Sequence, residues 1–219
     1  MLDKTKTDKE LGLRVRQMLK EKGIETPITE DYATSFDEFV PHFTQLLKML
    51  GLDLQDDSLQ DTPKRLAKMW VNELFWGLNP SNFPKLTVVE NKMKYREMVL
   101  ERRIRVSSTC EHHLSQIDGY AHVAYIPDKK VAGLSKLNRV VEYFSRRPQV
   151  QERLTEQIFH TLQYLLETDD VAIMMVAKHS CVKMRGIEDP NTDTITSRLG
   201  GAFYDDPSCR SEFMSLVKE

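Results

Sequence analysis

Alternating and continuous apolar stretches in the second half of the chain limit its fold more than any other feature. In residues 97–108, Leu100, Ile104 and Val106 lie at even positions with charged residues between them. This alternation is typical of a strand that buries one face. Residues 117–126 (IDGYAHVAYI) are expected to form the partner of this strand.

The segments that follow predict two helices and then two more strands. A helix that Ser135 can cap, and a second helix after Pro148, place apolar residues at helical spacing. Residues 171–182 (VAIMMVAKHSCV) form a nearly continuous apolar strand, and residues 193–204 form a weaker one that two glycines interrupt. The order of two strands, two helices and two strands predicts an α+β domain, which we assign to residues 95–219.

The N-terminal region, residues 1–94, is predicted to be mostly helical. Ser35 and Glu38 have the spacing of a capping box, but Pro41 would then lie inside the helix and remove a hydrogen bond. We therefore expect this helix to begin nearer Pro41. A later helix is predicted to begin with Thr62 as its N-cap.

Composition narrows the class of protein. The net charge of −2 gives no bulk attraction to nucleic acid or to an anionic membrane. No apolar run approaches the roughly 18 residues of a membrane span, and three cysteines do not suggest a disulfide framework. We expect a cytoplasmic protein without nucleic-acid or membrane partners. The two free edges of a four-stranded sheet would permit pairing with another chain.

Cysteine and histidine gather in two short segments, Cys110 to His113 and His179 to Cys181. Cys110 and His113 would point to opposite faces of an extended strand, so a shared metal requires a turn just after Cys110. Cys181 is the natural third ligand, because it belongs to the other strong strand. Three such ligands leave the fourth position of zinc open to water, as in catalytic sites.

Two further histidines are expected near this metal. His179 and Cys181 are two residues apart on one predicted strand and would share a face, while His112 adjoins a ligand. Both are candidates for proton transfer. A structural zinc with His112 or His179 as its fourth ligand also fits the spacing, and spacing alone does not choose between the two kinds of site.

Basic residues form a second group. An isolated pair of basic residues on a helix usually lies on a face that is exposed to solvent. Two pairs, however, adjoin the predicted metal-bearing or connecting segments, which suggests a polyphosphate beside a metal. The pairs are Lys136 with Arg139, Lys183 with Arg185, and Arg65 with Lys68.

Four motifs occur in order along the chain: Cys110–His113 (CEHH), Gly133–Arg139 (GLSKLNR), Arg147–Arg153 (RPQVQER) and His179–Gly186 (HSCVKMRG). In these motifs the sequence resembles GTP cyclohydrolase I, densely from about residue 56 to 216. The resemblance implies the tunnelling fold, in which ββααββ units join their strands across subunits into a barrel. It also implies a homodecamer of two pentamers, with active sites between subunits.

The resemblance further implies the reaction. GTP is hydrolysed at C8 of guanine, formate leaves, and the product is 7,8-dihydroneopterin triphosphate, the first step of tetrahydrofolate and pterin biosynthesis. Gln151 and Glu152 match the guanine-recognition pair; one carboxylate can accept hydrogen bonds from both N1–H and the 2-amino group, which adenine lacks.

The other functional residues also follow from the resemblance. The family's Zn²⁺ ligands are matched by Cys110, His113 and Cys181. Its proton-transfer residues are matched by His112 and His179. Its ribose and triphosphate contacts are matched by Ser135, Lys136, Arg139 and Arg185. Arg65 is a weaker match to the phosphate contacts.

Two alternatives remain open. One is another tunnelling-fold enzyme that acts on a different pterin or on a deazapurine. The other is a non-catalytic, zinc-stabilised oligomer that binds a nucleotide. A zinc nucleoside deaminase is disfavoured, because the sequence lacks the H-x-E…P-C-x₂-C signature.

Overall fold

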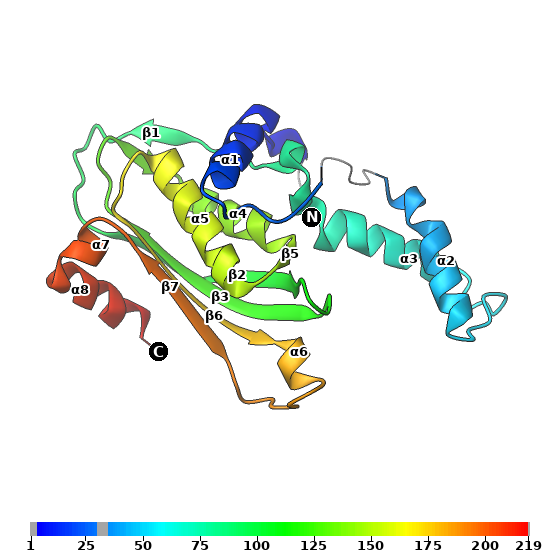
Figure 1. The fold of residues 1–219 in the computed structure, drawn as a ribbon. Coiled ribbons are helices and arrows are strands. Elements are labelled where there is room, and N and C mark those ends of the chain that lie inside the picture. Colours follow the sequence, from blue (N-terminus) through cyan, green and yellow to red (C-terminus); the bar gives the residue numbers. More distant parts are fainter. Residues whose placement is uncertain (1–3, 30–34, 219) are drawn as a thin grey trace.

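A curled five-stranded sheet forms the centre of the protein (Figure 1), whose computed structural model describes residues 4–29 and 35–218. The strand order is β5-β2-β3-β6-β7; only the β2–β5 pair is parallel. The strands are β2 (Val99–Cys110), β3 (Gln116–Tyr125), β5 (Pro148–Gln149), β6 (Val171–His179) and β7 (Thr194–Leu199). The α+β class and the predicted order of elements are confirmed.

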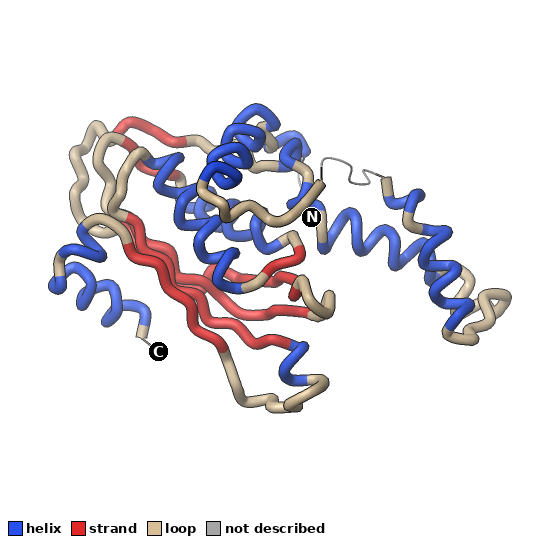
Figure 2. Tube along the Cα trace, viewed as in Figure 1, coloured by secondary structure: helices blue, strands red, loops and turns tan. Residues whose placement is uncertain are grey.

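Helices cover both faces of this sheet unequally (Figure 2). Two helices, α4 (Leu134–Ser145) and α5 (Gln151–Leu166), bury their apolar stripes against one face, and together with the strands and α1 they form the main hydrophobic core. Two C-terminal helices, α7 (Ala202–Asp205) and α8 (Pro207–Val217), pack against the other face in a smaller cluster. The helix expected to be capped by Ser135 has Gly133 as its N-cap instead, so that prediction is wrong.

A β-bulge in β2 changes which residues face the core. Glu101 pairs with Val123 and Ile104 pairs with Ala121, so β2 contains one residue more than β3 across this interval. Ile104 therefore packs beneath α4 and α5, whereas Leu100 packs in the cluster on the opposite face. The expectation that the even positions of this strand share one face is wrong for that reason.

Strand β6 ends earlier than the apolar run predicts. It stops at His179, and Cys181 belongs to a short helix, α6 (Ser180–Lys183). The argument that His179 and Cys181 share a strand face is therefore wrong. The last strand likewise ends at Leu199, and α7 occupies the end of the segment predicted as strand.

The N-terminal helices are α1 (Lys9–Glu21), α2 (Val40–Met49) and α3 (Thr62–Met69), and a π-helical turn, Trp70–Leu74, follows α3. The Ser35–Glu38 capping box is present, but it caps a separate 3₁₀ turn; α2 begins beside Pro41, as expected. Thr62 is the first helical residue rather than the N-cap, which is Asp61. Figure 1 shows α2 and α3 beside the sheet rather than over it.

Two short strands, β1 (Val88–Glu90) and β4 (Lys130–Ala132), pair with each other and were not anticipated. At three residues each, they are too short to produce a recognisable alternation. Within the described ranges, no helix is both long and apolar enough to cross a membrane.

A buried ion pair attaches the segment after α1 to the centre of the fold. Arg147 Nη1 lies 2.7 Å from Glu25 Oε1, and the two side chains are 2% and 7% exposed. Arg147 also donates from Nε to the carbonyl oxygen of Gly77, and its guanidinium lies over the ring of Tyr143. Arg147 directly precedes β5, so this anchor also supports the end of β2 that contains Cys110.

Candidate metal centre and active site

The turn that follows β2 brings Cys110 and His113 together. The Leu114 amide donates to the carbonyl oxygen of Cys110 at 2.9 Å, and the Cys110 amide donates to that of Ser115 at 2.8 Å. Leu114 adopts a positive φ of 50° to close this turn. The requirement that the chain turn just after Cys110 is therefore met, and His113 folds back over the strand end.

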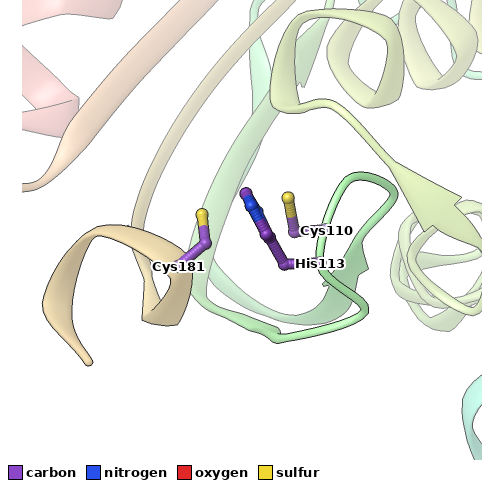
Figure 3. A group of neighbouring side chains, drawn as sticks. All are labelled: Cys110, His113 and Cys181. Carbon is purple, nitrogen blue, oxygen red and sulfur yellow. The ribbon is translucent and has the colours of Figure 1, made fainter. Parts of the chain in front are cut away.

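Cys110, His113 and Cys181 converge in space (Figure 3), and their possible ligand atoms all lie within 4.8 Å of one another. Cys110 is buried, Cys181 is half-buried and His113 is exposed, so the group opens to solvent on one side. Burial, followed by the hydrogen bond and the charge of Cys110, raises the pKa of Cys181. Two adjacent thiols with an imidazole form a donor set that fits zinc, because a cation would stabilise their thiolate forms.

His179 is held beside this group by Gln151, whose side chain is only 1% exposed. The amide nitrogen of Gln151 donates to the carbonyl oxygen of Thr194 at 2.9 Å, so its Oε1 is the atom that faces His179 Nε2, at 2.8 Å. Nε2 must then bear the proton, which leaves Nδ1 unprotonated in the neutral ring. Burial lowers the pKa of His179, and the negative charge of Glu152 partly opposes this effect.

His112 and Arg185 complete the surroundings of the cluster. His112 Nδ1 lies 3.9 Å from Cys110 Sγ, and the imidazole is largely exposed. Arg185 Nη1 lies 2.9 Å from His113 Nε2; a guanidinium can only donate, so this nitrogen accepts. The structure thus brings both expected proton-transfer histidines and one of the expected phosphate contacts to the cluster. It also shows that the Gln151 side chain is engaged with His179 and with the sheet.

The remaining expected phosphate residues lie elsewhere in the chain. The C-terminal end of α4 leads into β5, which pairs with Cys110. Ser135 lies about ten residues before the C-terminal end of α4. At a rise of 1.5 Å per residue, it is about 15 Å from that end along the helix axis. Lys136 and Arg139 share that distant half, and Lys136 Nζ donates to the carbonyl oxygen of Lys85. Arg65 lies on α3 and pairs with Asp61.

An ion pair between Glu111 and Arg153 was not anticipated from the sequence. Arg153 Nη1 and Nη2 lie 2.5 and 3.2 Å from the two carboxylate oxygens of Glu111. The hydrogen bond from Arg153, more than its charge, lowers the pKa of Glu111. Both residues lie inside the quoted motifs, but no spacing rule connects two positions so far apart in the chain.

Comparison with known proteins identifies the family of this chain. The family model described as GTP cyclohydrolase I matches residues 39–218. The chain belongs to the GTP cyclohydrolase I family. The match begins earlier than the dense resemblance seen in the sequence, and it includes α2. The curled sheet with its two covering helices is therefore the tunnelling fold of this family.

Individual GTP cyclohydrolase I relatives are similar over nearly their whole length. GTP cyclohydrolase 1 of Haemophilus ducreyi is 55% identical over 207 residues, covering 93% of this chain and 95% of the relative. The Pasteurella multocida protein of the same name is 53% identical, covering 94% of this chain and 96% of the relative. The GTP cyclohydrolase 1 of a Shewanella species is 51% identical, covering 95% of this chain and 98% of the relative.

Proposed function

We propose that this protein is a zinc-dependent GTP cyclohydrolase. It opens the imidazole ring of guanine at C8, releases formate and forms 7,8-dihydroneopterin triphosphate, the first step of tetrahydrofolate and pterin biosynthesis. One observation carries the proposal: in a chain of this family, the Cys110–His113–Cys181 group lies beside the His179–Gln151 pair. A structural site would need at most one of the two further histidines.

Zinc is the cofactor that this donor set favours. Cys110, Cys181 and His113 would hold it, and their number leaves a fourth position open. When bound at such a site, zinc supplies Lewis-acid activation of water near neutral pH. Thiolate ligands must stay reduced, which supports a cytoplasmic location.

The side chains around the cluster have separate roles in this proposal. The unprotonated Nδ1 of His179 can accept a proton and return it at the purine N7 during ring opening. The Glu152 carboxylate accepts from N1–H and the 2-amino group of guanine, while Gln151, assigned to the same recognition pair, holds His179 in one tautomer. His112 is the second proton-transfer group. The ribose and triphosphate are bound by Arg185, Ser135, Lys136, Arg139 and Arg65.

The separation of Ser135, Lys136 and Arg139 from the metal cluster supports a site shared between subunits of a homodecamer. Most of the outer edge of β2 is open, because β5 pairs only with Thr109 and Cys110. A cavity of about 720 Å³ lies along that edge. It is lined by β2 and by the face of α4 that includes Asn138, Glu142 and Arg146, at the helical spacing that also includes Ser135 and Arg139.

Mixing two inactive variants tests the shared site. Cys181→Ser removes a metal ligand and Lys136→Ala removes a phosphate contact, so each homo-oligomer is expected to be nearly inactive. If each site takes these residues from different subunits, dissociating and reassembling an equimolar mixture should restore about a quarter of the sites. Formate release measures the recovery. No recovery in mixed oligomers, verified by differently tagged subunits, would contradict a shared site.

Formate release from GTP tests the reaction itself and separates the alternatives. Zinc-loaded protein is expected to release formate and to give a fluorescent pterin after oxidation. ATP, which lacks the 2-amino group, should be turned over at least about 1,000-fold more slowly, because the Glu152 carboxylate would lose its partner. Faster turnover of another pterin or of a deazapurine would favour the other tunnelling-fold activity, and binding of GTP without turnover would favour the non-catalytic oligomer.

A further inference from the structure

The Glu111–Arg153 ion pair joins two segments that each contain proposed catalytic residues. Glu111 lies between Cys110 and His112 in the turn after β2. Arg153 lies in the first turn of α5, directly after Gln151 and Glu152. Both Arg153 nitrogens contact the carboxylate, at 2.5 and 3.2 Å, which fixes the relative orientation of the two groups as well as their distance.

Each end of this pair is itself held in place. The Glu111 amide donates to the carbonyl oxygen of Gln149 at 3.0 Å, so the turn is attached to the chain just before α5 by its backbone as well. At the other end, buried Gln151 connects the first turn of α5 to β7 and to His179. The ion pair therefore joins two segments that other hydrogen bonds already attach to the sheet.

Glu111 also faces His112. Its Oε1 lies 3.9 Å from His112 Nε2 and 3.2 Å from Arg153 Nη2. The carboxylate is thus placed between a proposed proton-transfer residue and the helix turn that presents Glu152. The His112 imidazole is largely exposed, and its Nδ1 lies 3.9 Å from Cys110 Sγ. Glu111 is therefore one of the groups that can set the orientation of this ring.

We propose that Glu111 and Arg153 form a positioning pair that sets the metal-binding turn, and His112 within it, against the guanine-recognising turn of α5. This inference rests on the proposed function and adds two residues that do not touch the substrate. Their side chains are about one-fifth exposed. Solvent partly screens a pair with this exposure, so we expect its loss to change the melting temperature little. Its main effect is on the geometry of the turn.

Three variants test the pair: Glu111→Gln removes the charge, Arg153→Met removes the guanidinium but keeps the stem, and the third combines both. Each single variant is expected to lower kcat about 100-fold, the scale of a misplacement near 1 Å, while the KM for GTP changes less than about threefold. The double variant should lose no more than either single variant, because one interaction has been removed in all three. Arg153→Lys keeps the positive charge but loses the two-nitrogen contact to the carboxylate, so its kcat should lie between those of Arg153→Met and the wild-type protein.

Zinc affinity gives a readout that does not depend on catalysis. Competition with a chromogenic chelator is expected to show about tenfold weaker zinc binding in Glu111→Gln and Arg153→Met, since neighbours that orient a metal ligand have effects of this size. Asp128→Asn is the matched control. It breaks another Arg–carboxylate pair, in which Arg96 Nη1 lies 2.7 Å from Asp128 Oδ1, and should leave kcat and zinc affinity unchanged.

Several results would overturn the proposal. Losses in kcat that multiply in the double variant would assign independent roles to the two residues. A raised KM with unchanged kcat would make them substrate ligands, and a lowered melting temperature with unchanged kcat and zinc affinity would make them a structural pair. If the wild-type protein itself releases no formate, the proposed function fails, and the zinc measurements still decide whether the pair orients the metal-binding turn.

Discussion

Alanine at position 179 is expected to lower kcat for formate release by about 10²–10⁴-fold, the usual contribution of a positioned acid–base group. His179 adjoins the Cys110–His113–Cys181 group without being one of its three converging residues. Gln151 Oε1 is hydrogen-bonded to Nε2 of the ring, so Nδ1 is the nitrogen that can exchange a proton with the substrate. Zinc content and assembly should therefore stay at the wild-type level in His179→Ala.

Three measurements on His179→Ala decide this prediction: single-turnover formate release, zinc by mass spectrometry, and molecular mass by light scattering. Loss of zinc or of assembly together with activity would show that His179 is a structural ligand. Gln151→Glu is a useful companion, because it keeps the size of the side chain and changes its charge beside His179. A shifted pH dependence of kcat in that variant would show that Gln151 controls the protonation of the imidazole.

Loss of one thiol should affect metal binding as well as catalysis. Cys181→Ala is expected to abolish stoichiometric zinc binding and to reduce formate release at least about 1,000-fold, because the metal supplies much of the rate enhancement of an enzyme of this kind. Burial, and then the neighbouring Cys110, raises the pKa of Cys181, so a nearby cation would favour the thiolate form of Cys181. Removing either thiol therefore removes much of the attraction between this group and a cation.

The third cysteine provides a control for Cys181→Ala. Cys209 lies in α8 and packs against the smaller hydrophobic cluster, on the face of the sheet opposite α4 and α5. Cys209→Ala should keep wild-type zinc content and activity. A Cys181→Ala protein that still bound one zinc per chain and released formate would contradict the proposed ligand set.

Part of the site could be predicted from the sequence by geometry alone. Cys110 and His113 can meet only if the strand ends between them, and the alternating pattern does end there. Cys181 was assigned correctly to the cluster but for a partly wrong reason. The predicted strand extends through Val182, although the polar residues Lys178, His179 and Ser180 interrupt the apolar run where β6 stops and a helix begins.

Other features depend on contacts that no local pattern encodes. The bulge after Glu101 moves Leu100 and Ile104 to opposite faces of β2; three consecutive charged residues, Glu101 to Arg103, interrupt the alternation there but do not by themselves specify a bulge. The Glu111–Arg153 pair depends on how α5 lies against the turn after β2, and that arrangement follows from packing. The roles of Ser135, Lys136 and Arg139 came only from the family resemblance, because spacing alone describes an ordinary basic helix face.

Zinc content and formate release, measured on one preparation of assembled protein, test the central claim most directly. We predict that formate release from GTP rises in proportion to bound zinc. Removal of the metal with a chelator should abolish it, and added zinc should restore it. Activity that persists in fully zinc-free protein, or the absence of formate from fully loaded and assembled protein, would contradict the assignment of a zinc-dependent GTP cyclohydrolase.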